Sequence, residues 1–194
     1  AYRGLPPDPA ERTNGWEKLT GGPVAARFRP SYPRSVVTQL MRAVDPADFA
    51  EPLRVSAFMD RDPDMGVDRL TSGLVEFPGG RQLAFTCAGQ LVLHQVMQLY
   101  GSKGRIQLEI PFNAPHDRPA RMFIDDGRDL TGGGIETIEF PAMNQFLMQA
   151  DRFADAIHGK GEVPVRLEDS IANMAVIDAL FRSAESGRME AVAG

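Results

Sequence analysis

The chain has 194 residues, of which 43% are hydrophobic and 24% are charged. This mix is typical of a soluble protein with its own core, and the length allows one domain of ordinary size. The formal net charge of −5 argues against a nucleic-acid surface, and no apolar run is long enough for a transmembrane helix or a signal peptide. The single cysteine, Cys87, excludes an internal disulfide and favours a reducing, cytoplasmic compartment.

Residues 1–50 are predicted to form an irregular lead-in, opening with a short strand at residues 1–4 and followed by one helix. Nine of the 15 prolines fall in the first 65 residues, and the run Leu5-Pro6-Pro7-Asp8-Pro9 fits neither a helix interior nor a central strand. Apolar residues then recur at helical spacing from Pro33 to Val44, which predicts a helix there.

The middle of the chain is predicted to be a sheet. Segments rich in β-favouring or alternating residues lie at 53–59, 67–77, 83–87, 91–100, 106–110, 121–125 and 135–140. The spacers are rich in glycine, proline and aspartate, and no helical pattern separates the segments. Successive strands without intervening helices predict an antiparallel meander of six or seven strands.

The end of the chain is predicted to be helical. One apolar stripe consists of Phe146, Leu147, Ala150, Phe153, Ala154 and Ile157, and Gly159 is placed to end that helix. A second stripe consists of Ile171, Met174, Ile177, Phe181 and Ala184, with Glu168, Asp169 and Ser170 at its start and Gly187 at its end. The expected fold class is therefore α+β, an open and mostly antiparallel sheet with helices packed on one face. Residues 51–194 form the sheet domain, and the whole chain is expected to be one domain.

The glycine runs do not predict a nucleotide site. Gly132-Gly133-Gly134 lacks the G-x-G-x-x-G spacing and precedes a predicted strand where a helix would be needed. The segment Gly101-Ser102-Lys103-Gly104 could cradle an anion, although a strand-joining turn is the simpler interpretation. The sequence predicts no cofactor-binding residue and no metal site.

The histidines, the cysteine and the aspartate cluster do not predict a catalytic or metal site either. His94 lies in a predicted strand, His116 in a loop and His158 at a helix end, so each is first interpreted as structural. Cys87 alternates with Leu83 and Phe85 and is predicted to be a small core residue. A further group, Asp60, Asp62, Asp64 and Asp68, lacks the closing glutamate of a calcium loop and is interpreted as a solvated turn.

Several segments, in order and over about 140 residues, carry a family resemblance. They include Asp60-Arg61-Asp62-Pro63, Glu76-Phe77-Pro78-Gly79-Gly80, Tyr100-Gly101-Ser102-Lys103-Gly104-Arg105-Ile106, Ile110-Pro111-Phe112-Asn113-Ala114-Pro115 and Leu167-Glu168-Asp169-Ser170. On these residues the chain resembles the C-terminal domain of the Gfo/Idh/MocA oxidoreductases. The resemblance implies an open sheet with helices on one face, which contributes the substrate pocket, and a separate Rossmann domain that holds NAD or NADP. In many members the other face of the sheet joins subunits.

The sequence departs from the family in two ways. It has no N-terminal βαβ pattern and no dinucleotide fingerprint, so the Rossmann half is expected to be absent. The first helix of the family's C-terminal domain usually carries G-G-x-L-x-D-x-G-x-[HY], and the corresponding stretch here is residues 21–33. In that alignment Tyr32 matches the family's tyrosine and is the candidate catalytic residue, whereas Phe28 stands where an aspartate is expected.

These observations predict the substrate-binding and oligomerisation half of an NAD(P)-dependent oxidoreductase acting on a sugar, polyol or related hydroxyl compound. The expected partners are the missing Rossmann domain and a second copy joined through the open sheet face. Neither a nucleic acid nor a membrane is expected as a partner. The dimer is favoured because apolar residues occur in both registers of 91–100, although the loop at 111–120 could instead cover that face. One alternative is a stand-alone ligand-binding or scaffold module, and a second is an independent enzyme that uses His94 or Tyr32.

Overall fold

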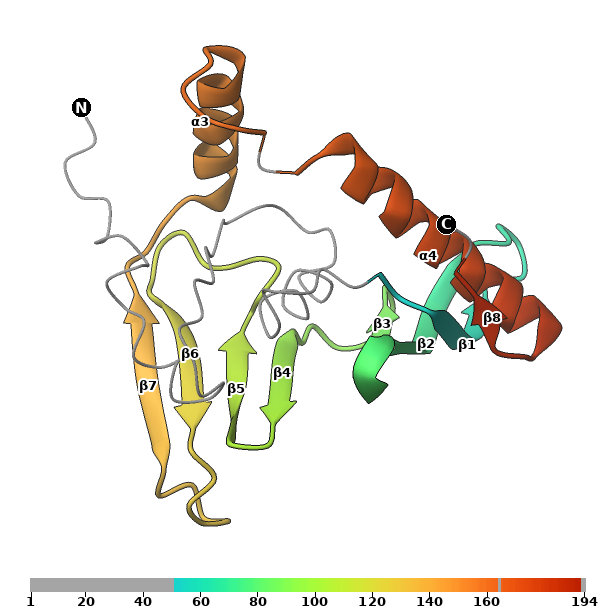
Figure 1. The fold of residues 1–194 in the computed structure, drawn as a ribbon, viewed down its shortest axis with the longest axis horizontal. Helices are drawn as coiled ribbons and strands as arrows, with labels where there is room; N and C mark the ends of the chain where they lie inside the picture. The colour runs from blue at the N-terminus through green and yellow to red at the C-terminus, as the bar shows by residue number, and fades with distance from the viewer. Residues whose placement is uncertain (1–50, 164, 193–194) are drawn as a thin grey trace. The chain divides into compact units, whose positions relative to one another are not determined.

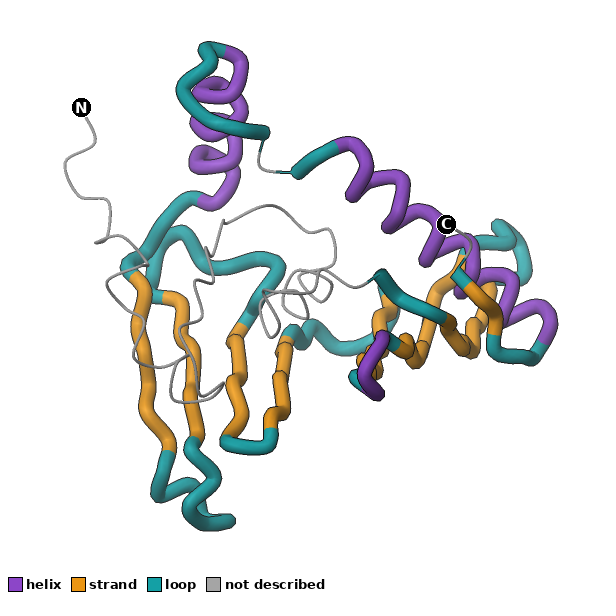
Figure 2. Tube along the Cα trace, in the orientation of Figure 1, coloured by secondary structure: helices purple, strands orange, loops and turns teal. Residues whose placement is uncertain are grey.

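The computed structural model describes residues 51–163 and 165–192, and these form two compact units. The first unit combines residues 51–93 with residues 165–192, and the second consists of residues 94–163. Each unit is built on its own antiparallel sheet (Figures 1 and 2). The α+β class is confirmed, and the sheet that the sequence predicted as one is divided into two.

The sheet of the first unit has the strand order β3-β2-β1-β8. Its strands are β1 (Arg54–Arg61), β2 (Asp68–Glu76), β3 (Gln82–Ala88) and β8 (Glu190–Ala191). The short 3-10 helix η2 (Pro78–Gly80) joins β2 to β3. Gly79 and Gly80 both have positive φ angles, a conformation that glycine adopts without steric cost. The last strand, β8, is only two residues long, and it brings the end of the described chain back to β1.

Helix α4 (Leu167–Ser186) packs on one face of this sheet (Figure 1). The core between helix and sheet contains Val55, Ala57, Val75, Ala179 and Leu180, all less than 9% exposed. Gly73 makes the close packing possible, because a Cβ atom there would lie 2.5 Å from the Phe85 ring and 3.3 Å from Leu180. Packing that leaves no room for one methyl group is typical of a well-filled core.

The buried side of α4 differs from the stripe predicted by periodicity. The buried residues are Ala179, Leu180 and Ser183, whereas Ile171 is 63% and Met174 is 51% exposed. The helix is apolar around much of its circumference, so spacing alone could not identify the side that meets the sheet. Its acidic first turn and the left-handed Gly187 at its end are confirmed, but its N-cap residue, Arg166, makes no capping side-chain hydrogen bond.

The sheet of the second unit has the order β4-β5-β6-β7. Its strands are β4 (Val96–Gly101), β5 (Gly104–Glu109), β6 (Ala120–Asp125) and β7 (Ile135–Phe140). One face is apolar, with Ile106, Met122 and Ile124 at its buried centre and Leu99, Leu108 and Ile138 packed around them. Met122 and Ile124 therefore lie on the face opposite Phe123, as the alternation predicted.

Helix α3 (Gln145–Ile157) follows β7 and lies beyond the end of that sheet (Figure 1). The Asn144 side chain caps it by accepting hydrogen bonds from the backbone N–H groups of Phe146 and Leu147, at 3.0 and 3.2 Å. Gly159, with φ of 69°, follows its last turn. The helix was predicted correctly, and two large side chains of its predicted apolar stripe are more than half exposed, Phe153 at 56% and Ile157 at 68%.

Other expectations need correction. Residues 91–95 are not part of a strand, so β4 begins at Val96 and His94 lies outside it. Cys87 is exposed rather than a core residue. The predictions for residues 1–50, including the helix at Pro33 to Val44, lie outside the described residues.

Within residues 51–163 and 165–192, no helix has the length and apolar character needed to cross a membrane.

Candidate functional site

The outer face of the second sheet is a candidate binding surface. Because side chains alternate along a strand, residues one position away from the buried set all point to this side. We call it the open face, and it consists of Val96, Gln98, Tyr100, Arg105, Gln107, Glu109, Arg121, Phe123, Asp125, Ile135, Thr137 and Glu139. Most of these side chains are polar or charged, in contrast to the apolar face behind them.

An ion pair lies at the centre of one cross-strand row of the open face. The Arg105 guanidinium donates to the Asp125 carboxylate over 2.9 Å, and the Asp125 side chain is only 9% exposed. Asp125 also accepts a hydrogen bond from the backbone N–H of Gly127, at 3.0 Å. Hydrogen bonding from Gly127 and then from Arg105 favours the ionised carboxylate, so the pKa of Asp125 is below its usual value.

Hydrogen bonds extend across the other rows. The Gln98 amide donates to Gln107 over 2.9 Å, and the Tyr100 hydroxyl donates to Gln98. Arg121 donates two hydrogen bonds to the Glu109 carboxylate, at 2.9 and 2.8 Å. The same guanidinium lies 5.7 Å from the centre of the Phe123 ring. This network fixes long side chains that would otherwise be mobile on an exposed sheet.

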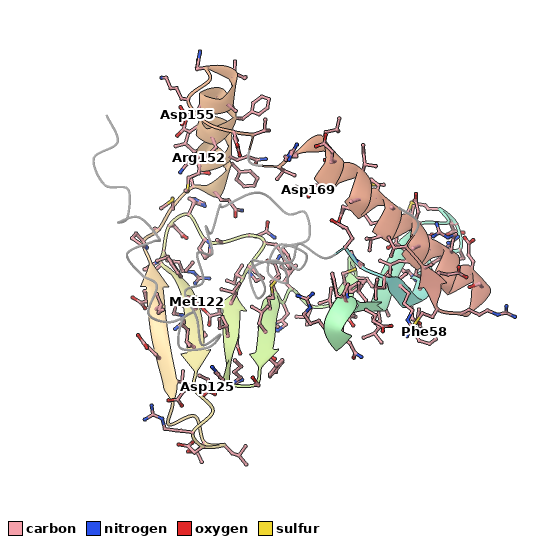
Figure 3. The ribbon with its side chains drawn as sticks, viewed as in Figure 1. Phe58, Met122, Asp125, Arg152, Asp155 and Asp169 are labelled. Carbon is pink, nitrogen blue, oxygen red and sulfur yellow. The ribbon has the colours of Figure 1, made fainter. Side chains whose placement is uncertain are left out.

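A shallow hollow of about 150 Å³ lies in the open face. It is lined by Arg105, Gln107, Phe123, Asp125 and Ile135, which combine an ion pair, an amide, an aromatic ring and an aliphatic side chain. Figure 3 shows Asp125 near one end of β6. Such a lining is suited to recognising another surface or a small polar molecule. It contains no pairing of a nucleophile with a base, so it does not indicate a reaction centre.

We expect the Asp125→Asn variant to be less stable than the native chain at pH 7 and to differ less from it at pH 3. A carboxylate whose folded pKa is depressed stabilises the fold above its unfolded pKa of about 3.9, and this contribution is lost as the pH falls through the folded pKa. Urea unfolding at the two pH values measures the effect. The exposed Asp151→Asn variant is the control, and an unchanged Asp125→Asn deficit at pH 3 would contradict the prediction.

A second constellation fixes the loop after β5. The Gln95 side-chain oxygen accepts hydrogen bonds from the backbone N–H groups of Phe112 and Asn113, at 3.3 and 3.2 Å. The Gln145 amide, at the start of α3, donates to the Phe112 carbonyl over 3.3 Å. Ile110 has a φ angle of 47°, which is unusual for a β-branched residue and costs free energy. The two glutamines hold this strained loop and attach α3 to it.

The residues singled out in the sequence are not brought together. Tyr32, the candidate catalytic residue, and Phe28 lie outside the described residues. His94, His116 and His158 are all exposed, and they lie before β4, in the loop between β5 and β6, and at the end of α3. Among the described residues, no three histidine, cysteine, aspartate or glutamate side chains are grouped so as to hold a metal ion.

The aspartate-rich segment and Cys87 also have structural explanations. Asp62 accepts hydrogen bonds from the backbone N–H groups of Asp64 and Met65, which closes the turn between β1 and β2. Asp60 pairs with Arg69 over 2.6 Å, and Asp68 accepts from the Thr71 hydroxyl. Desolvation, followed by the charge of Asp68, raises the pKa of the Cys87 thiol, which disfavours the reactive thiolate.

The glycine runs of the described residues do not fit a nicotinamide cofactor. Gly101 and Gly104 pair across the hairpin that joins β4 to β5. Gly132, Gly133 and Gly134 lead into the strand β7, and the Gly133 N–H is already used by Asp129 at 3.0 Å. A dinucleotide pyrophosphate needs free N–H groups at a strand-to-helix turn, and these turns connect strands.

The sequence matches one protein family over most of its length. The family is described as "Oxidoreductase family, C-terminal alpha/beta domain", and the match covers residues 34–193. The chain is 41% identical over 143 residues to an uncharacterized oxidoreductase of Rhizobium meliloti, covering 74% of this chain and 43% of the relative. It is 30% identical over 138 residues to D-xylose 1-dehydrogenase (NADP(+)) 2 of Haloferax volcanii, covering 70% and 40%.

Solved structures share the fold. An aldose-aldose oxidoreductase from Caulobacter crescentus, complexed with glycerol, superposes with a TM-score of 0.63 at 22% identity, over 80% of this chain and 44% of the other. A mutant of a 3-ketoreductase from Actinomadura kijaniata, in complex with TDP-benzene and NADP, gives a TM-score of 0.61 at 20% identity, over 77% and 46%. The chain thus spans less than half the length of these relatives.

Proposed function

Because the chain belongs to the Gfo/Idh/MocA oxidoreductase family, as its C-terminal alpha/beta domain, we propose that it is the substrate-binding and subunit-association half of an NAD(P)-dependent oxidoreductase. The observation that carries the proposal is the family match over residues 34–193, together with the confirmed α+β architecture. The nicotinamide cofactor would be held by a Rossmann domain of the parent protein. This assignment agrees with the described glycine turns, which do not suit a pyrophosphate.

The proposed substrate is a sugar, a polyol or a related hydroxyl compound. The support comes from the relatives, which include a D-xylose 1-dehydrogenase and an aldose-aldose oxidoreductase. Tyr32 is the proposed catalytic residue of this half, where it would handle a proton of the substrate. The alternative is a stand-alone ligand-binding or scaffold module. The open face favours this alternative, because its side chains are suited to binding another molecule but do not form a reaction centre.

The test compares the isolated chain with the full-length protein encoded by the complete reading frame. We expect the full-length protein to oxidise or reduce members of an aldose and polyol panel with NAD(H) or NADP(H). The isolated chain should show no saturable NADPH binding by calorimetry at micromolar concentrations. A full-length protein that is folded but inert toward the whole panel would favour the scaffold alternative, and tight NADPH binding to the isolated chain would contradict the proposed division of roles.

A second copy of the chain is the proposed partner of the open face. The hydrogen-bonded side chains there are already ordered, so a partner would have little conformational freedom to remove on binding. Tyr100 is 73% and Ile135 is 43% exposed on this face, and both could enter the surface of a second copy. Light scattering should give a dimer for the native chain and a monomer for the Phe123→Arg variant. A native chain that stays monomeric at concentrations of about 100 µM would contradict the proposal.

A further inference from the structure

The chain contains one long segment without any lysine, arginine, aspartate or glutamate. It runs from Gln82 to Ser102 and also lacks proline. The next longest stretch of this kind, residues 140–150, is about half as long, in a chain of which 24% of the residues are charged. The segment includes strands β3 and β4 and the irregular residues 89–95 that connect them. We call it the uncharged segment.

Strands β3 and β4 are both edge strands, since each lies at one end of its sheet order. An edge strand exposes backbone N–H and C=O groups that can pair with another strand, and charged side chains or a short length normally prevent this. The other two edges have such protection: β7 carries Glu136 and Glu139, and β8 is only two residues long. Neither β3 nor β4 has a charged residue, and within the described residues no strand pairs with the outer edge of either one.

The connection between these two edges is apolar and exposed. Leu91, Val92 and Leu93 are 56%, 88% and 100% exposed. Residues 91–100 combine β-favouring side chains with no charge, no proline and no glycine, which is the composition that favours pairing between identical strands. Like charges placed opposite each other oppose such a pairing. The uncharged segment can therefore meet a copy of itself in any register without this repulsion.

We propose that the uncharged segment is a self-association surface, which pairs strand to strand with the same segment of a second copy. The inference goes beyond the proposed function and differs from the open-face dimer, because the contact is made by backbone groups of β4 and residues 91–95. These irregular residues must first be ordered as a strand, so the pairing is slow. A pair formed through β4 leaves the edges of β3 available, so the assembly continues beyond a dimer.

The test follows light scattering of the isolated chain with time, together with hydrogen exchange of the assemblies that form. We expect freshly dissolved chain to grow into particles larger than dimers, at a rate that rises with its concentration. The amides of residues 91–100 should become protected in these particles. The Val92→Lys variant should slow the growth at least about tenfold, because it places like charges in the paired strands.

Two further variants separate strand pairing from a general effect of charge. Val67→Lys is the matched control, because it makes the same substitution at a valine that is 53% exposed and lies outside the uncharged segment. It should assemble like the native chain. Val92→Pro adds no charge but removes a backbone N–H donor, and it should slow the growth as Val92→Lys does. Urea unfolding should give the Val92→Lys and Val67→Lys chains equal stability, since both side chains are exposed.

Each of the other results would overturn the proposal. A native chain that does not grow with time, or equal growth of the Val92→Lys and Val67→Lys chains, would show that the uncharged segment does not pair. Protection of residues 91–100 in freshly dissolved chain at every concentration would show that these amides are covered within one chain. The Phe123→Arg variant, which removes the proposed open-face dimer, should still grow. If it does not, the assembly belongs to the open face.

Discussion

Replacing Phe28 with aspartate is expected to raise the turnover of the full-length protein by about 100- to 10,000-fold, the usual contribution of general acid–base catalysis. The family motif places an aspartate four residues before its His or Tyr, one helical turn away, and this chain has Phe28 and Tyr32 at those positions. A tyrosine near pKa 10 is a poor base at neutral pH unless a neighbour assists it. Phe28 offers neither a charge nor a hydrogen bond. Turnover is measured under saturating cofactor with an aldose and polyol panel.

Two further variants separate the charge from the change of shape. Phe28→Asn provides a polar side chain of the same size as aspartate but without a carboxylate. It should recover much less turnover than Phe28→Asp. Adding Tyr32→Phe to the aspartate variant should remove the gain, because the proton would no longer have a phenolic partner. Equal turnover of the native and Phe28→Asp proteins would show that residues 21–33 are not aligned with the family motif. That result would also remove Tyr32 from the proposed site.

The local elements could be predicted from the sequence because their signals are local. Ile106 and Leu108 alternate with Gln107 and Glu109, and the structure places them on opposite faces of β5. Gly187 ends α4 with a φ of 66°, as the position of a glycine after an apolar helix indicates. In these cases the hydrophobic period or the backbone freedom of one residue decides the outcome, and no distant contact is needed.

The pairing of the elements could not be predicted in the same way. Strand β8 consists of two residues, Glu190 and Ala191, and only its contact with Arg54 and Val55 identifies it. Cys87 alternates with Leu83 and Phe85 as a core residue would, but it lies near the end of an edge strand and is exposed. The division into two sheets follows from the irregular residues 89–95 between β3 and β4, where a continuous apolar run suggested a strand.

The contacts of the candidate surface also could not be predicted from sequence patterns, because they join residues that are far apart in the chain. Arg105 and Asp125 are 20 residues apart in the chain, and their pairing follows from the register of β5 and β6. The Gln95 and Gln145 contacts to Phe112 depend on a loop and a helix start that carry no local signal. Ser183 was also missed, since a serine beside Phe181 and Ala184 in a helix suggests nothing by itself. A polar residue at an apolar position of the helical period is the signal that could have found it.

Replacing Ser183 with alanine is expected to destabilise the first unit by about 2–4 kcal/mol. The Ser183 side chain is 1% exposed, and its hydroxyl accepts from the Ala57 N–H at 3.1 Å and donates to the Arg188 carbonyl at 2.5 Å. One hydroxyl thus joins α4, strand β1 and the segment that leads to β8. Alanine would leave the buried Ala57 N–H and the part-buried Arg188 carbonyl without this partner, at a cost of about 1–3 kcal/mol for the buried N–H and less for the carbonyl that water can reach, and β8 would lose its anchor. Urea unfolding of the isolated chain measures the loss. Ser186→Ala, in the last turn of the same helix, removes an exposed hydroxyl that donates to the Glu190 carboxylate at 2.7 Å and accepts from the Arg188 N–H at 3.2 Å, and water can replace both of these exposed bonds. The control should therefore lose no more than about 1 kcal/mol. If the two variants lose equal stability, the Ser183 hydroxyl is not what holds β1 and the end of the chain against α4.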